Sequence, residues 1–140
     1  MYELKVQDHF DAAHRLLKYE GKCSRLHGHT WTVIACVKVG KKGVLGISLD
    51  FSLLKEELKK VVDEFDHKVL LSEEDPLLYH LNLQDVVLLK PNPTAEVIAE
   101  SIYELLLRAL HELGAEDIEE LTVTVREGVN NECTYNPRRS

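Results

Sequence analysis

The alternation of apolar and polar side chains in two long N-terminal segments constrains the fold most. In residues 1–14 the apolar side chains share one parity: Tyr2, Leu4, Val6, Phe10, Ala12, with His14 continuing the same face. In residues 30–39 a second apolar face runs in phase with His29: Trp31, Val33, Ala35, Val37, Val39. Successive strand side chains point to opposite faces, so both segments are predicted to be strands with one buried face.

Two later segments show helical spacing. Asp50 is predicted to cap a helix that runs through Phe65. Its apolar stripe comprises Phe51, Leu54, Leu58, Val61 and Phe65. A second helix is predicted to start at residues 92–94, with Pro93 near its first turn, and to stop at Gly114. Its apolar stripe comprises Ile98, Ile102, Leu105, Ala109 and Leu113.

The remaining segments complete the predicted order of elements. Residues 72–90 are predicted to be mostly loop, with a short apolar strand at 86–89. Further strands are expected at 121–127 and around 133–135, joined by a turn. The expected fold is a single α+β domain, residues 1–140, with a four-stranded antiparallel sheet and two helices on one face. Its open sheet edges favour oligomerisation.

Charge and composition exclude several classes of partner. The net charge of −7, with acidic and basic residues interspersed, argues against nucleic-acid or anionic-membrane partners. No apolar run approaches the ~20 residues that a membrane span needs, and the N-terminus does not read as a signal peptide. Three irregularly spaced cysteines do not form a disulfide framework, so a cytoplasmic location is expected.

Three histidines suggest a metal site. His27 and His29 are separated by one glycine, so in an extended segment both imidazoles lie on one face. His14 ends the first predicted strand on its apolar face. Three imidazoles with one open position are the ligand count of catalytic zinc, although copper, nickel or iron would also suit them. Taken singly, each histidine could instead be a surface or hydrogen-bonded core residue.

Several other residues could carry chemistry, each with a structural alternative. Cys23 could act as a base or nucleophile near the metal, Lys22 and Arg25, or could be a small buried side chain. Cys36 and Cys133 are interpreted as structural. Asp66 and His67 follow the first predicted helix, where they could form a solvated helix end or supply a proton-transfer group.

Glu127 keeps the inward parity of its predicted strand. An inward carboxylate needs a partner, and a guanidine-like edge of a heterocycle would supply two parallel N–H donors. Alternatively, the strand end curls into solvent. Glu96, two residues after Thr94, most simply complements the dipole of the second helix.

Six segments, taken together and in this order, resemble the 6-pyruvoyl-tetrahydropterin synthase family. Within it they are most similar to the 6-carboxy-tetrahydropterin synthases of 7-deazaguanine (queuosine and archaeosine) biosynthesis. The segments span nearly the whole chain: FDAAHRL at 10–16, CSRLHGH at 23–29, LDFSLLK at 49–55, FDHK at 65–68, NPTAE at 92–96 and VRE at 125–127. The stretch 72–90 is longer than expected for bacterial members.

The resemblance implies a role for each matching residue. The implied zinc ligands are His14, His27 and His29. Cys23 matches the catalytic thiol, while Asp66 and His67 match a proton-relay pair that reaches the cysteine from a neighbouring subunit. The residues implied to bind or line the pterin are Glu127, Thr94 and Glu96. The family's tunnelling fold closes the sheets of trimers into barrels, and two trimers stack into a homohexamer.

The implied reaction is the zinc-dependent conversion of 7,8-dihydroneopterin triphosphate to 6-carboxy-5,6,7,8-tetrahydropterin, acetaldehyde and triphosphate. Three residues separate Cys23 from His27, the spacing associated with the 6-carboxy enzymes. No glutamate lies between them, unlike in a branch linked to folate synthesis. Two alternatives remain open: a 6-pyruvoyl-tetrahydropterin synthase, which keeps the side chain, and a non-catalytic protein that binds a pterin or purine.

Overall fold

The first two strands form a long antiparallel ribbon. In the computed structural model, which describes residues 1–138, β1 (Tyr2–His14) pairs with β2 (His27–Val39) along their full lengths. The register runs from Tyr2 opposite Val39 to His14 opposite His27. The predicted alternation is confirmed, and the register places two of the three candidate metal ligands side by side.

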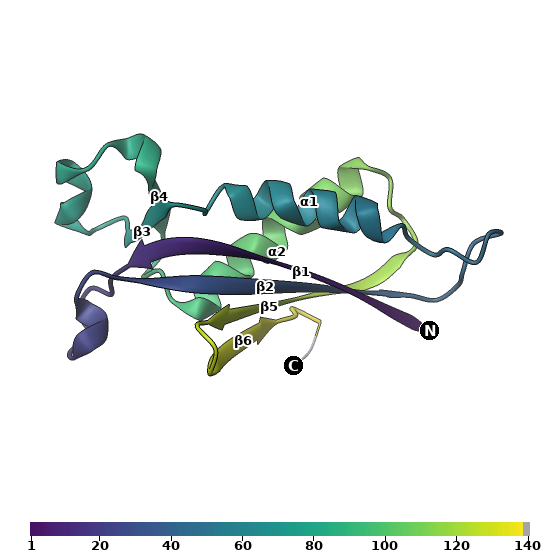
Figure 1. Ribbon diagram of the computed structural model, residues 1–140, viewed down its shortest axis with the longest axis horizontal. Helices are drawn as coiled ribbons and strands as arrows, with labels where there is room; N and C mark the ends of the chain where they lie inside the picture. The colour runs from purple at the N-terminus through teal and green to yellow at the C-terminus, as the bar shows by residue number, and fades with distance from the viewer. Residues whose placement is uncertain (139–140) are drawn as a thin grey trace.

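Four shorter strands extend this ribbon into a curled sheet with the order β4-β3-β1-β2-β5-β6 (Figure 1). On one side, β5 (Ile118–Glu127) pairs antiparallel with β2, and β6 (Asn131–Tyr135) pairs antiparallel with β5. On the other side, β3 (Lys68–Ser72) runs parallel to β1, and β4 (Val86–Leu89) runs parallel to β3.

The predicted four-stranded antiparallel sheet is therefore wrong in strand number and in direction. The short strand at residues 86–89 is confirmed as β4, but β3 was not predicted at all. Its last three residues, Leu70, Leu71 and Ser72, are all buried, so the segment has no alternation to reveal it. Parallel strands covered on both faces commonly lack that alternation.

Both helices begin at side-chain caps. The Asp50 carboxylate accepts from the backbone N–H of Ser52 at the start of α1 (Phe51–Asp63). The Thr94 hydroxyl accepts from the N–H of Val97 at the start of α2 (Ala95–Glu112). These bonds satisfy N–H groups that have no partner within the helix.

The helix boundaries and faces differ in detail from the predictions. Helix α1 ends two residues before Phe65, and Pro93 precedes the Thr94 cap rather than lying in the first turn. Leu113 lies at the C-terminal cap and is 47% exposed. The buried face of α2 comprises Ile98, Ala99, Ile102, Tyr103, Leu106 and Leu110. Gly114 follows with φ of 72°, as a left-handed helix stop requires.

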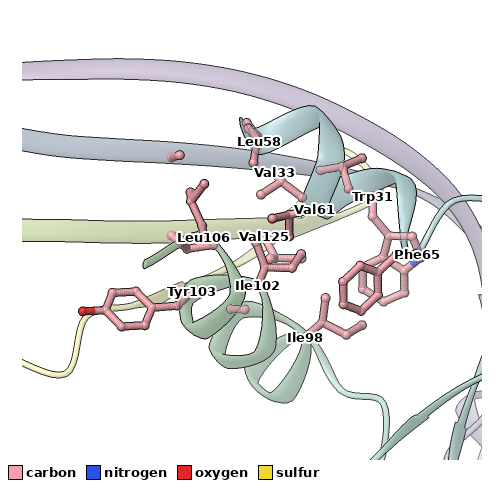
Figure 2. Packing of buried hydrophobic residues seen from close by; sticks show 14 of the residues in the cluster. Trp31, Val33, Leu58, Val61, Phe65, Ile98, Ile102, Tyr103, Leu106 and Val125 are labelled. Atoms are coloured by element: carbon pink, nitrogen blue, oxygen red, sulfur yellow. The ribbon is translucent and has the colours of Figure 1, made fainter. Parts of the chain in front are cut away.

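The core lies between the two helices and one face of the sheet (Figure 2). Trp31 is fully buried, stacks with Phe10 at 6.0 Å between ring centroids, and donates from its indole N–H to the carbonyl of Ala12. Its edge also contacts the rings of His14 and His29. The core therefore supports the strand ends that carry these imidazoles. In residues 1–138, no helix is long and apolar enough to cross a membrane.

A buried ion pair ties the long 72–90 segment to the end of β1. Asp75 is fully buried, and both its carboxylate oxygens accept from the guanidinium of Arg15. Asp75 also accepts from the backbone N–H of Leu77. Next to this pair, the side chain of Asn92 accepts from the N–H of Leu17 and donates to its carbonyl. These contacts hold the loop after β1 at the end of the sheet where His14 lies.

Replacing Asp75 with asparagine is expected to lower the free energy of unfolding by about 3 kcal/mol near neutral pH, because Arg15 loses its buried partner. The Arg15 hydrogen bonds lower the pKa of Asp75. The stabilisation should be complete above the ordinary aspartate pKa, about 4, and should fade as the pH drops through the lower folded-state value.

Urea unfolding at one fixed protein concentration measures this difference. The control is Glu74→Gln, since the carboxylate of Glu74 forms an exposed ion pair with Lys18. That variant should change the free energy of unfolding by less than about 0.5 kcal/mol. Equal effects of the two substitutions would contradict a structural role for the Asp75 pair.

Candidate metal centre

Three imidazoles and one carboxylate converge where β1 ends and β2 begins. The ligand atoms of His14, His27, His29 and Glu127 all lie within 4.8 Å of one another. The Nε2 atoms of His14 and His27 are 3.1 Å apart. Glu127 Oε1 lies 2.8 Å from His29 Nε2 and 3.7 Å from His14 Nε2. The three predicted metal ligands therefore meet, and Glu127 points inward to join them rather than curling into solvent.

Backbone carbonyls orient two of the rings. His14 Nδ1 lies 2.8 Å from the carbonyl oxygen of Pro93, and His27 Nδ1 lies 2.6 Å from that of Arg25. A carbonyl only accepts, so each Nδ1 carries the proton and each Nε2 presents a lone pair to the cluster. Burial lowers the pKa of His14, which favours the neutral imidazole that binds metals.

The cluster fits a tetrahedral metal ion. Bonds of about 2.0–2.1 Å in a zinc tetrahedron place neighbouring ligand atoms about 3.3 Å apart, and the distances here scatter around that value. The contact of His29 Nε2 with Glu127 does not have the geometry of a hydrogen bond. Among residues 1–138, this nitrogen is buried without a hydrogen-bond partner. A buried ring nitrogen without a hydrogen-bond partner, close to two further imidazoles, is suited to bind a metal.

Cys23 lies in the loop between β1 and β2. It is the middle residue of a short 3-10 turn, Lys22–Ser24, and its side chain is half-buried. The carbonyl of Cys23 accepts from the N–H of Leu16, which ties the turn to the residues just after β1. In residues 1–138, the thiol is not part of either cluster of potential metal ligands. It therefore lies outside the immediate coordination group.

Asp66 and His67 belong to a second cluster, with Asp11. Asp66 accepts from the N–H of Asp11, and this bond lowers the pKa of Asp66. The imidazole Nδ1 of His67 lies 2.9 Å from Asp66, and the N–H of His67 donates to the carbonyl of Asp11. His67 has φ of 60°, a left-handed conformation that lets adjacent side chains meet.

This second cluster faces away from the candidate metal ligands. Asp11 has the opposite parity to His14 on β1, and its carboxylate accepts from the hydroxyl of Thr30 on the outer face of the sheet. His67 is exposed there. Within residues 1–138, Cys23, Asp66 and His67 do not form a common cluster. Asp66 and His67, which the family resemblance implies to be a proton-relay pair, contact each other here, although their adjacency alone did not imply it. The single chain does not bring them to the thiol.

The other predicted residues lie outside the first cluster. Thr94 caps α2 directly after Pro93, whose carbonyl holds His14, and Glu96 lies exposed in the first turn of that helix. Cys133 is half-buried on β6, where burial raises the pKa of its thiol. Burial likewise raises the pKa of Cys36. Both thiols are thereby held in the neutral form.

The supporting carbonyls of Pro93 and Arg25 were not predicted. A carbonyl acceptor is available at every residue, so no side-chain pattern identifies it. The one indirect indication in the sequence is that Pro93 precedes a helix cap, where its ring fixes the backbone angle φ.

Comparison with known proteins identifies the family to which this chain belongs. Residues 3–138 match the family 6-pyruvoyl tetrahydropterin synthase. A Bacillus subtilis protein named 6-carboxy-5,6,7,8-tetrahydropterin synthase is 34% identical over 139 residues, covering 99% of this chain and 87% of the relative. A Rickettsia conorii protein of the same name is 37% identical over 95 residues, covering 64% and 69%.

Solved structures show the same fold. A catalytic-residue mutant of Plasmodium vivax 6-pyruvoyltetrahydropterin synthase has a TM-score of 0.80 at 25% identity, covering 96% of both chains. The Plasmodium falciparum enzyme has a TM-score of 0.81 at 23% identity, with the same coverage. The family and the named relatives mark this chain as an enzyme of the lyase class. The chain belongs to the 6-pyruvoyl tetrahydropterin synthase family.

Proposed function

We propose that this protein is a zinc-dependent lyase that makes 6-carboxy-5,6,7,8-tetrahydropterin. Its substrate would be 7,8-dihydroneopterin triphosphate, which reacts with water to give the product, acetaldehyde and triphosphate. The observation that carries the proposal is the cluster of three imidazoles and Glu127 beside the Cys23 loop. The names of the relatives at 34–37% identity support the 6-carboxy reaction.

His14, His27 and His29 would hold the zinc ion, which when bound acts as a Lewis acid toward the side-chain hydroxyls of the substrate. The Glu127 carboxylate would accept from the 2-amino and ring N–H groups of the pterin and so orient the ring. The Thr94 and Glu96 segment, tied to His14 through Pro93, would line the same pocket.

The Cys23 thiolate would take a proton from the substrate side chain. His67 would exchange protons on the opposite side, with its ring held by Asp66 at 2.9 Å. Both residues must face one substrate, yet His67 lies on the outer face of its own sheet. We therefore propose that His67 and Asp66 serve the Cys23 of a neighbouring subunit, within a cytoplasmic homohexamer built as a dimer of trimers. Each subunit would consist of a single domain.

The direct test is to incubate zinc-loaded protein with 7,8-dihydroneopterin triphosphate and to follow the products by mass together with acetaldehyde release. We expect 6-carboxy-tetrahydropterin and acetaldehyde in equal amounts. A 6-pyruvoyl product without acetaldehyde would make the chain a 6-pyruvoyl-tetrahydropterin synthase. No conversion by folded, metal-filled protein would favour a pterin- or purine-binding role without catalysis.

A further inference from the structure

We infer that Glu127 closes the fourth coordination position of the metal in the substrate-free protein and leaves it when the pterin binds. The inference rests on the proposed function, since it concerns how that site opens. Glu127 would bind either the metal or the pterin ring. Binding of the ring would therefore open the metal to the side chain of the substrate.

The position of the carboxylate supports the first half of the inference. Oε1 of Glu127 approaches His29 and His14 to 2.8 and 3.7 Å. These distances bracket the separation of about 3.3 Å expected between two ligands of one tetrahedral zinc ion. The oxygen thus lies where a fourth ligand belongs. Three imidazoles and one carboxylate form a closed four-ligand set.

The chemistry of a carboxylate supports the second half. Accepting two parallel N–H bonds from a pterin occupies both carboxylate oxygens, one on each donor. Oε1, which faces the imidazoles, is one of those two oxygens. Each oxygen has two lone pairs, but a metal on Oε1 would withdraw charge from that oxygen and fix the orientation of the carboxylate, so the metal and the pterin N–H groups compete for Glu127. Pterin binding and an open fourth position are coupled through this one side chain.

Glu127 is also the member of the cluster that is best placed to move. His14 and His27 are each held by a backbone carbonyl, and His14 is packed against Trp31. Glu127 is the last residue of β5, its side chain is 24% exposed, and Gly128 follows with φ of 70°. Within residues 1–138, the only ion pairs of its carboxylate are with His14 and His29. Rotation of this side chain leaves the core packing undisturbed.

The test uses the assembled protein loaded with Co²⁺ and inorganic azide as a probe of the open position. Azide binding is followed by the visible absorption of the cobalt. We expect azide to bind E127Q at least about tenfold more tightly than the wild type, because the neutral amide is a poor metal ligand. Wild-type protein should gain the same azide affinity when 6-methylpterin is added, since this compound carries no side-chain hydroxyls.

The matched control is E132Q, which removes the charge of an exposed glutamate on neighbouring β6 that pairs with Arg126. It should bind azide like the wild type. Should E127Q fail to retain cobalt, E127D keeps the charge but shortens the reach, and should also gain azide affinity. Wild type that binds azide as tightly as these variants would overturn the inference, as would 6-methylpterin leaving azide binding unchanged. Turnover of the natural substrate tests the proposed function separately.

Discussion

Replacing Cys23 with alanine is expected to lower kcat by about 10²–10⁴-fold, the contribution of a positioned acid or base. The metal content should not change, because the thiol lies outside the cluster of His14, His27, His29 and Glu127. The turn that carries Cys23 is held by backbone contacts to Leu16 and Arg25, so its position should survive loss of the side chain. Single-turnover rates and zinc stoichiometry, measured on the same preparation, give both quantities.

The matched control for this substitution is Cys36→Ala. Cys36 is also half-buried, but it lies in the middle of β2 opposite Lys5, away from the strand ends that carry the imidazoles. Its removal should leave kcat within about twofold of wild type, as for most substitutions remote from the chemistry. Full activity of the Cys23 variant would exclude the thiol from proton transfer. Loss of zinc in that variant would instead make Cys23 a metal ligand.

The arrangement of β1 and β2 was predictable because one face of each strand is buried. A shift of one strand by one residue would turn the apolar side chains of that strand to solvent, so the alternation also fixes which residues share a face. His14 and His29 follow that alternation, and the structure brings them together. Strand β3 was not predictable in this way, because both its faces are covered by protein.

The partners of the candidate site residues were harder to predict than their identities. Nothing in the sequence indicated that Pro93, 79 residues after His14, supplies the carbonyl that orients its ring. The inward parity of Glu127 indicated a partner, but not that the partner would be two imidazoles. Contacts between distant segments depend on the packing of the whole sheet, which local patterns do not describe.

Mixing two inactive variants is expected to restore activity. Cys23→Ala and His67→Asn each remove one component, and asparagine is chosen because it tolerates the positive φ of His67. If each site takes Cys23 from one subunit and His67 from its neighbour, random assembly at equal amounts leaves about a quarter of the sites with both groups. Coexpression of differently tagged chains, followed by purification through both tags, provides the mixed oligomers, whose kcat per chain is then measured.

Wild-type chains mixed with the double variant Cys23→Ala/His67→Asn provide the control. Without exchange of subunits this mixture retains half of the wild-type activity. Random assembly lowers it to about a quarter when sites are shared across a symmetric interface, whereas sites built within one chain would keep it at half.

Background activity in the mixed single variants, together with half activity in this control, would place Cys23 and His67 in the same subunit. The cluster on the outer face of the sheet would then have to approach the thiol by movement of its own chain, although the Asp11 contacts tie it to β1. Restoration to a quarter requires no such movement, because a neighbouring subunit would then bring its His67 to the strand ends that carry the imidazoles.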